Sequence, residues 1–249
     1  MRILLVNDDG YSAKGIYHLA KAAAQLGEVW IVAPRTQCSA MSHKITFGRT
    51  FLIRKEQVLD GIPAFSVDGT PADCVKIAVN HILPEKPDIV LSGINDGYNA
   101  GIDILYSGTV AAAMEALVQG IPAMAFSIGR KGDLTAAEQW VPMVFRELQQ
   151  RPIASNEVWN VNFPACSVEE LSGILYDRKP ANETPYNDKC YEQTPVDDTS
   201  WELTQKMQWT TSNEPDTDLA AVRENYIAVS KIRNPILRPD RQIPRGGKV

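Results

Sequence analysis

The chain has 249 residues, 44% hydrophobic and 22% charged, which is typical of one folded α/β domain with an extension and excludes a disordered chain. Its net charge of −5 argues against a nucleic acid polymer as partner, because neutralising many phosphates requires clustered Lys and Arg. The N-terminus lacks the pattern of a secretory signal, and no apolar run approaches the ~20 residues that span a bilayer, so we expect a cytoplasmic protein without membrane contact.

The first part of the chain has the pattern of one β–α–β unit. Residues 2–7 form a short apolar run that stops at Asp8-Asp9-Gly10, as expected for a strand buried on both faces of a parallel sheet. Apolar residues then recur at helical spacing over residues 16–26, and residues 29–33 repeat the buried-strand pattern. Residues 35–66 are less regular and predict a hairpin or a flap.

The alternation of helices and strands continues up to residue 163. We expect, in order, a helix at 71–83, a strand at 88–91, a small-residue helix ending at Gly120, a strand at 121–128 and a last strand at 158–163. Thr135 and Glu138 have the spacing of a capping box for one more helix, which Pro142 must kink unless the helix begins there. Residues 1–165 are therefore predicted to be the catalytic core, and residues 166–249, where apolar periodicity fades, an extension of the same domain.

Polar side chains follow several of these strands. Ligands of open parallel sheets bind beyond the carboxyl ends of the strands, where neighbouring loops meet. Those loops carry Asp8 and Asp9, then Ser39, then Asn95 and Asn99, and Ser107 opens a helix. Two adjacent carboxylates in a dry crevice favour a cation between them, and oxygen ligands suit Mg²⁺, Mn²⁺ or Ca²⁺. The alternative for Asp-Asp-Gly alone is an ordinary turn.

The segment Ser107-Gly108-Thr109 has the character of an anion site. Free N–H groups and the helix dipole favour phosphate at a helix N-terminus, although a plain serine cap is the commoner meaning of such a segment. Metal ligands and an anion site on loops of one sheet together predict metal-assisted phosphoryl transfer to water.

Five segments in this order resemble the SurE (survival protein E) family. They are residues 1–10, residues 33–40 with Ala33-Pro34 and Gln37-Cys38-Ser39-Ala40, then Gly69-Thr70-Pro71-Ala72-Asp73-Cys74-Val75, Ser92-Gly93-Ile94-Asn95 and Tyr106-Ser107-Gly108-Thr109-Val110. The resemblance is close over the first two-thirds of the chain and weaker at Thr217-Asp218 and Tyr226.

The resemblance implies a metal-dependent 5′/3′-nucleotidase that acts on nucleoside monophosphates. It implies one divalent cation per subunit, Mg²⁺ or Mn²⁺ with Ca²⁺ as a possible non-native occupant, bound by Asp8, Asp9, Ser39 and Asn95. It also implies a Rossmann-like, doubly wound core and a C-terminal extension exchanged between subunits of a homodimer or homotetramer. The chain departs from the family pattern at Asp96, which adds a carboxylate near the site, and at Ser230-Lys231-Ile232.

In the resulting mechanism, Asp8 or Asp9 orients or deprotonates a water, and the substrate phosphate contacts Gly10, Asn99, Ser107, Gly108 and Thr109. A covalent aspartyl-phosphate phosphatase is the nearest rival, but Gly10 and Ser12 stand where its D-x-D-x-T motif needs Asp and Thr. A dinucleotide-dependent oxidoreductase needs glycines where this chain has two aspartates. A non-catalytic nucleotide-binding or interaction protein, using the aromatic-rich extension as its contact surface, is the third alternative.

Overall fold

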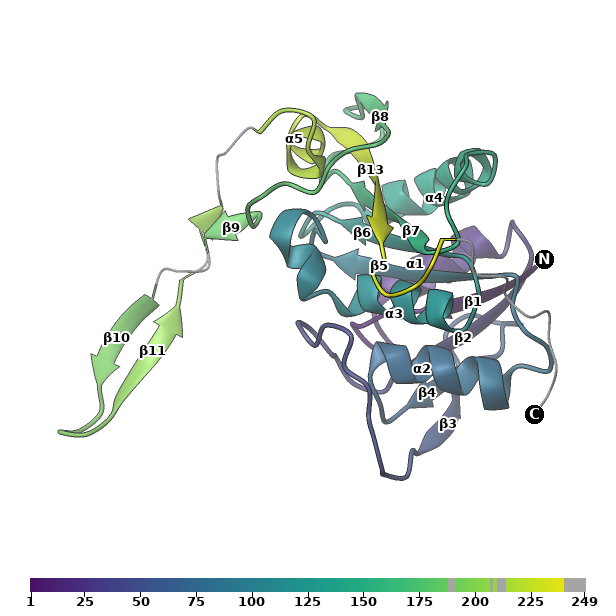
Figure 1. Cartoon of the computed structure of the whole chain (residues 1–249), viewed down its shortest axis with the longest axis horizontal. Helices are drawn as coiled ribbons and strands as arrows, with labels where there is room; N and C mark the ends of the chain where they lie inside the picture. Colours follow the sequence, from purple (N-terminus) through teal and green to yellow (C-terminus); the bar gives the residue numbers. More distant parts are fainter. Residues whose placement is uncertain (188–190, 207, 210–213, 240–249) are drawn as a thin grey trace.

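The computed structural model describes residues 1–187, 191–206, 208–209 and 214–239, and Figure 1 shows a central sheet from which one hairpin projects. The nine strands of the sheet are β1 Arg2–Val6, β2 Glu28–Pro34, β3 Ile53–Glu56, β4 Ala64–Val67, β5 Ile89–Asp96, β6 Ala123–Ile128, β7 Glu157–Phe163, β8 Gly173–Leu175 and β13 Tyr226–Arg233. Their order across the sheet is β3-β4-β2-β1-β5-β6-β7-β13-β8.

The centre of the sheet is parallel. Strands β4, β2, β1, β5, β6 and β7 pair in parallel, and the apolar runs seen in the sequence are buried on both faces, as such strands require. The chain winds outwards from β1 in one direction through β2 and from β5 in the other through β6. The Rossmann-like α/β fold expected from the sequence is therefore confirmed.

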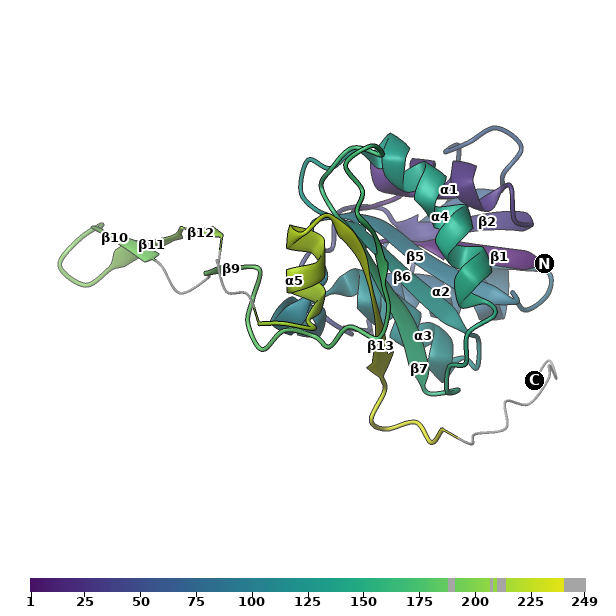
Figure 2. The same ribbon diagram turned by 90° about the horizontal axis from the view of Figure 1, so that it is seen from above.

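Four helices cover the two faces of the sheet, as Figure 2 shows from above. One face carries α1 Lys14–Ala23 and α4 Leu134–Leu148, and the other face carries α2 Pro71–Ile77 and α3 Gly108–Val118. Helix α2 continues into a π-helical turn at Ala78–Ile82. A fifth helix, α5 Asp218–Arg223, precedes β13. Among the described residues, no helix combines the length and apolar character needed to cross a membrane.

Two expectations about the elements are wrong. Strand β7 is not the last strand, because β13 adds to it antiparallel and β8 then pairs with β13. The capping box of Thr135 and Glu138 does not form: α4 is capped by Asp133, whose side chain accepts from the Thr135 amide at 2.8 Å. Pro142 lies inside α4, where the buried apolar face of the helix offsets the lost backbone hydrogen bond.

The two segments without clear periodicity in the sequence, residues 35–66 and the extension, each contain antiparallel strands. Strand β3 pairs antiparallel with β4, so part of residues 35–66 is a hairpin-like edge, and residues 36–52 form a long loop that we call the Ser39 loop. In the extension, β10 Tyr191–Pro195 and β11 Trp201–Gln205 form an antiparallel hairpin that extends away from the body of the molecule (Figures 1 and 2). The two-residue strands β9 Tyr186–Asn187 and β12 Gln208–Trp209 pair at its base.

Candidate active site

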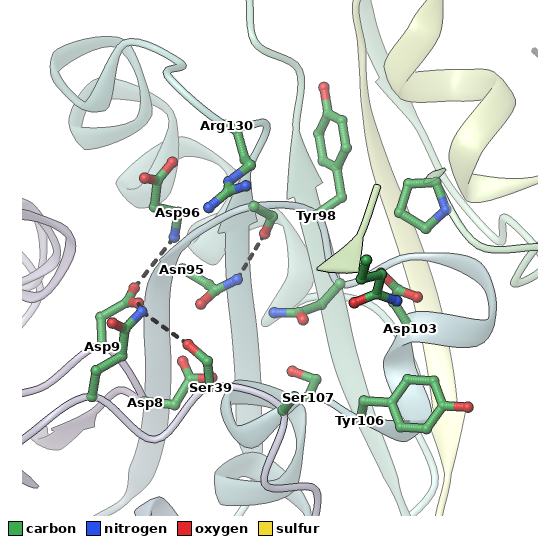
Figure 3. Close-up of a pocket in the computed structure, with 16 residues that line it drawn as sticks. Asp8, Asp9, Ser39, Asn95, Asp96, Tyr98, Asp103, Tyr106, Ser107 and Arg130 are labelled. Atoms are coloured by element: carbon green, nitrogen blue, oxygen red, sulfur yellow. Dashed lines mark hydrogen bonds between the residues drawn. The ribbon is translucent and has the colours of Figure 1, made fainter. Parts of the chain in front are cut away.

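A cavity of about 360 Å³ lies beyond the carboxyl ends of β1 and β5, the two strands between which the winding of the sheet reverses (Figure 3). This is the position at which open α/β sheets bind ligands. Six of the predicted site residues line it: Asp8, Asp9, Ser39, Asn95, Asn99 and Ser107. The loops that the sequence singled out therefore meet at one place.

Asp8 is the most tightly held of these side chains, at 4% exposure. Its Oδ1 accepts a hydrogen bond of 2.5 Å from the Thr109 hydroxyl, and a Cβ added to Gly108 would lie 2.8 Å from the Cβ of Asp8. Burial raises the pKa of Asp8 from 3.8 to about 6; the hydrogen bond from Thr109 opposes this rise, and the charge of Asp9 adds to it. The start of α3 thus fixes a carboxylate that is costly to ionise.

Asp9 is held more loosely and faces more polar groups. Its Oδ2 accepts from the Asp96 amide at 3.3 Å, and its Oδ1 lies 3.4 Å from Nε2 of Gln37. Gln37 also donates to the hydroxyl of Ser39 at 2.9 Å, which links the loops after β1 and β2. Burial raises the pKa of Asp9, and the nearby charge of Arg130 acts in the opposite direction. Of the two aspartates, Asp9 is the more accessible to a water.

Asn95 reaches the cavity because the pairing of β5 with β6 is irregular. The register shifts between Ser92 and Asn95, and such an irregularity changes the direction in which a side chain points. The Nδ2 of Asn95 donates to the Gly97 carbonyl at 2.8 Å, which leaves its Oδ1 available for a cation (Figure 3).

Asn99 is held by a buried set of polar side chains from β6 and β7. Its amide donates to Oδ1 of Asn162 at 2.9 Å, its carbonyl accepts from Asn160 and Asn162, and its Nδ2 donates to Ser127 at 2.7 Å. These contacts place Asn99 in the cavity wall. The sequence did not reveal Asn160 and Asn162, because buried asparagines in a strand have no recognisable spacing.

Three predicted phosphate contacts do not line the cavity: Gly10, Gly108 and Thr109. Thr109 is fully buried, and its hydroxyl donates to Asp8, so its predicted contact with phosphate stays a prediction. Gly108 packs against Asp8, and the Gly10 carbonyl accepts from the side chain of Asn7. Ser107 remains in the cavity wall while its hydroxyl caps α3 by accepting from the Val110 amide at 3.0 Å.

The cavity also contains residues that sequence reasoning missed. Arg130, in the loop after β6, is the only basic side chain among the described residues that line it. Pro185 and Gln205 come from the extension, and Tyr98, Asp103 and Tyr106 complete the wall together with residues already named. A basic residue directly after a predicted strand was a signal that could have identified Arg130, whereas nothing local marks Pro185 or Gln205.

The family model described as survival protein SurE matches residues 3–184. The chain belongs to the SurE family. It is 42% identical over 243 residues to the 5′-nucleotidase SurE of Clostridium tetani, covering 93% of each chain. It is 35% identical over 232 residues to the 5′-nucleotidase SurE of Chlorobium chlorochromatii, covering 92% of this chain and 85% of that one. The crystal structure of the SurE protein from Aquifex aeolicus superposes with a TM-score of 0.79 at 35% identity, covering 94% and 93% of the two chains.

The charge of the cavity in this SurE protein suits a bound cation. Four carboxylates line it, those of Asp8, Asp9, Asp96 and Asp103, against the single guanidinium of Arg130. Within the described ranges, no group of three or more His, Cys, Asp or Glu side chains could hold a metal ion, so a site here needs neutral ligands as well. Ser39 and Asn95 offer a hydroxyl and an amide oxygen beside the two aspartates, which is a donor set for a hard cation.

Proposed function

We propose that this SurE-family protein is a metal-dependent phosphatase that hydrolyses nucleoside 5′-monophosphates, and 3′-monophosphates, to nucleoside and phosphate. The observation that carries the proposal is the meeting of Asp8, Asp9, Ser39 and Asn95 at one cavity of suitable size for a small molecule. The relatives named 5′-nucleotidase SurE, which align over most of this chain, support the nucleotide as substrate.

The proposed cation, Mg²⁺ or Mn²⁺ with Ca²⁺ as a non-native occupant, would be held by these four side chains. When bound, it would polarise the phosphate and favour the ionised form of a water. The other contributions come from the protein. In hydrolysis, the water oxygen bonds to phosphorus, the ester bond to the nucleoside oxygen breaks, and that oxygen takes a proton.

We assign the proton acceptor of the attacking water to Asp9. It lines the cavity, its hydrogen bonds of 3.3 and 3.4 Å are long, and burial raises its pKa, which makes it a better base than an ordinary aspartate. Asp8 is less suited, because the Thr109 hydroxyl and the close packing of Gly108 fix its carboxylate. Asp8 is therefore given a purely cation-binding role.

The phosphate would lie between Ser107 and Arg130. The N-terminus of α3 favours an anion electrostatically, and Ser107 is the part of that N-terminus that lines the cavity. Asn99 offers a neutral polar contact in the same wall. Arg130 supplies a positive charge that is independent of the cation, and its guanidinium lies near Asp96 in Figure 3.

We also propose that the protein forms homodimers or homotetramers through its extension. The projecting hairpin exposes Tyr191, Val196, Trp201 and Leu203, each more than half exposed, on a segment with little support from the body of the molecule. Large apolar side chains gathered on one projecting element are typical of a surface that another subunit covers. The cytoplasmic location expected from the sequence stays a prediction.

The function is tested by measuring phosphate release from a panel of nucleoside 5′- and 3′-monophosphates with Mg²⁺, Mn²⁺, Ca²⁺ or EDTA. We expect release with Mg²⁺ or Mn²⁺ that stops in EDTA and returns when metal is restored. Asp9→Asn should lower turnover by about a hundredfold or more, the usual effect of losing a general base. Asp60→Asn, which removes an exposed carboxylate in a distant turn, is the matched control.

Two results would contradict the proposal. Tight nucleotide binding without phosphate release under any metal would favour a binding module. Unchanged turnover of Asp9→Asn at saturating metal would remove Asp9 from the mechanism. Acid quench of a single turnover of ³²P-labelled nucleotide separates the covalent alternative, because an aspartyl-phosphate intermediate leaves ³²P on the protein, whereas direct attack by water does not.

A further inference from the structure

The Ser39 loop, residues 36–52, adopts a backbone conformation that needs external support. Just after Ser39, both Ala40 (φ 54°) and Ser42 (φ 51°) lie in the left-handed region, which residues with a Cβ disfavour. Such residues persist only where the surrounding contacts hold them. Part of that support comes from Ser42, whose amide and hydroxyl donate to the carbonyls of Tyr106 and Leu105 at 2.9 and 2.8 Å.

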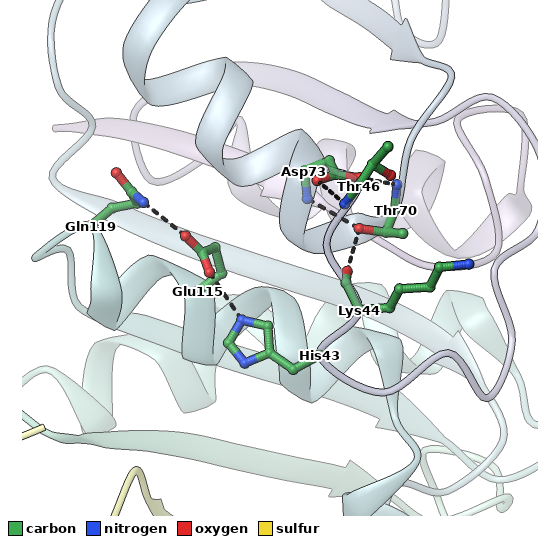
Figure 4. Close-up of polar contacts among 7 residues, drawn as sticks. All are labelled: His43, Lys44, Thr46, Thr70, Asp73, Glu115 and Gln119. Carbon is green, nitrogen blue, oxygen red and sulfur yellow. Dashed lines mark hydrogen bonds and ion pairs between the residues drawn. The ribbon is translucent and has the colours of Figure 1, made fainter. Parts of the chain in front are cut away.

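A second contact to the loop comes from Glu115 of α3. Glu115 lies near the middle of this helix, among buried alanines and other apolar side chains, and is itself 4% exposed. Its two carboxylate oxygens are both engaged: Oε1 accepts from Nε2 of Gln119 at 2.7 Å, and Oε2 lies 3.0 Å from Nε2 of His43 (Figure 4). Only the histidine side of the pair is substantially exposed, at 37% of its side chain.

A buried carboxylate is a poor choice for stability at this position. Removing it from water carries a large cost that its partners only partly offset, and an apolar residue of similar size would pack against the same neighbours without that cost. What Glu115 adds is a directional contact that specifies where His43 lies. The pair therefore has the properties of a device that fixes geometry rather than one that adds stability.

The helix that carries Glu115 also builds the candidate active site. The N-terminus of α3 holds Asp8 through Thr109 and places Ser107 in the cavity wall. Two turns later, Glu115 holds the loop that brings Ser39 to the same cavity. Helix α3 thus sets the position of Asp8 relative to that of Ser39, although the two residues come from different loops. A precise metal site requires rigid support of this kind.

Residues 44–46 of the loop are held separately, by the start of α2. The Thr46 amide donates to the carboxylate of Asp73 at 3.0 and 3.2 Å, and the Thr70 hydroxyl donates to the Lys44 carbonyl at 2.6 Å (Figure 4). Losing His43 should therefore loosen residues 39–43, where the hydrogen bonds of Ser42 remain, while residues 44–46 stay attached. The role of His43 can therefore be measured by comparing residues 39–43 with residues 44–46 of the same loop.

We infer that His43 is a positioning residue: through its contact with Glu115 it holds the Ser39 loop in the arrangement that presents the Ser39 hydroxyl to the cation. His43 itself does not line the cavity. The inference rests on the proposed function for its catalytic meaning, but its structural part, the fastening of the loop, can be measured without any activity.

The test compares His43→Ala, the conservative His43→Gln, whose amide can still donate to Glu115, and His18→Ala. His18 is the matched control, because it forms a similar pair with Glu138, at 2.7 Å between α1 and α4, and lies outside the cavity. Hydrogen exchange of peptides covering residues 36–47 is measured in EDTA, and Mn²⁺ binding by calorimetric titration. Glu115→Gln is a second variant that weakens the pair from the other side.

We expect His43→Ala to exchange about tenfold faster at residues 39–43, the effect of losing about 1.4 kcal/mol of contact to a charged group, with little change at residues 44–46. Mn²⁺ binding should weaken about three- to tenfold, since the loop must then be ordered on binding. The metal concentration for half-maximal phosphate release should rise equally, while kcat at saturating metal stays within about twofold. His43→Gln should recover most of both effects, and His18→Ala should show neither.

Exchange at residues 39–43 that is as slow in His43→Ala as in His18→Ala would overturn the inference. So would a collapse of kcat with unchanged Mn²⁺ affinity, because His43 would then act on the substrate directly. If the unmodified protein binds Mn²⁺ but releases no phosphate, the proposed function fails while the exchange and binding measurements still decide the role of His43.

Discussion

The substitution Asp8→Asn should make the metal-free protein more stable at neutral pH. Burial raises the pKa of Asp8 from 3.8 to about 6, and each pKa unit corresponds to about 1.4 kcal/mol, so the ionised carboxylate costs the folded state about 3 kcal/mol. Asparagine has nearly the same shape and can still accept from the Thr109 hydroxyl, yet it has no charge to desolvate. Asp8→Asn should therefore raise the free energy of unfolding by at most about 3 kcal/mol.

The direction of the pKa shift predicts how the stability difference between Asp8→Asn and the unmodified protein changes with pH. Because the pKa is higher in the folded state, the stability associated with protonated Asp8 is fully present below pH 3.8 and is lost as the pH rises through about 6. The difference in unfolding free energy between Asp8→Asn and the unmodified protein should thus be near zero at pH 4, grow up to about pH 6.5 and then level off. Urea unfolding in EDTA at pH values from 4 to 8 measures it, with Asp60→Asn as the control for an exposed carboxylate.

Added metal should reverse the order of stability. A cation at one thousand times its dissociation constant stabilises the folded protein that binds it by about 4.1 kcal/mol, which exceeds the advantage of about 3 kcal/mol of Asp8→Asn in EDTA, and Asp8→Asn should gain little of this. An Asp8→Asn protein that is less stable than the parent at pH 8 in EDTA, or a stability difference that does not change with pH, would refute the reasoning. Either result would mean that burial does not destabilise the Asp8 carboxylate.

Two further substitutions test other parts of the proposals. Arg130→Gln should raise KM for nucleotide about three- to tenfold and change kcat less than about twofold, as expected for losing an exposed charge contact of about 1 kcal/mol. If KM is the same as in the exposed control Arg146→Gln, Arg130 does not bind the phosphate. Trp201→Ser with Leu203→Ser should lower the molar mass measured by light scattering towards that of a monomer. Equal masses for this variant, the parent and the control Ile236→Ser, exposed outside the hairpin, would contradict the assembly through the extension.

The parallel core could be predicted because its signals are local. Strands buried on both faces appear as short apolar runs, and the runs at β1, β2, β5 and β6 lie where the sequence placed them. Strand β13 was missed although residues 226–233 contain a buried apolar stretch, because it joins the sheet only after residues 176–225, which lie outside the sheet. Its partner β7 is distant in sequence, and no local pattern specifies such a pairing.

The candidate site was predictable at the level of loops but not of contacts. The topology rule brought Asp8, Ser39 and Asn95 together, since each follows the end of a strand expected from the sequence. The roles within the loops depend on packing: the contact of the Thr109 hydroxyl with Asp8 has no signal in the sequence. The supporting group Asn162 was not identified, because its significance comes entirely from partners elsewhere in the sequence.

The charge of the cavity bears on the order in which cation and substrate bind. With all four carboxylates ionised, the lining has a formal charge of −3, since only Arg130 is positive among the described lining residues. A phosphate dianion entering such a cavity is repelled, and low polarity around the buried Asp8 makes the repulsion stronger than in water. A divalent cation held by Asp8, Asp9, Ser39 and Asn95 would reduce the net negative charge of the lining to −1 and so weaken the repulsion. The proposed mechanism therefore requires the cation before the nucleotide. Nucleotide affinity should then follow the occupancy of the cation site, and the variants that loosen that site, at Asp8 or at His43, should weaken nucleotide binding in proportion to their loss of metal.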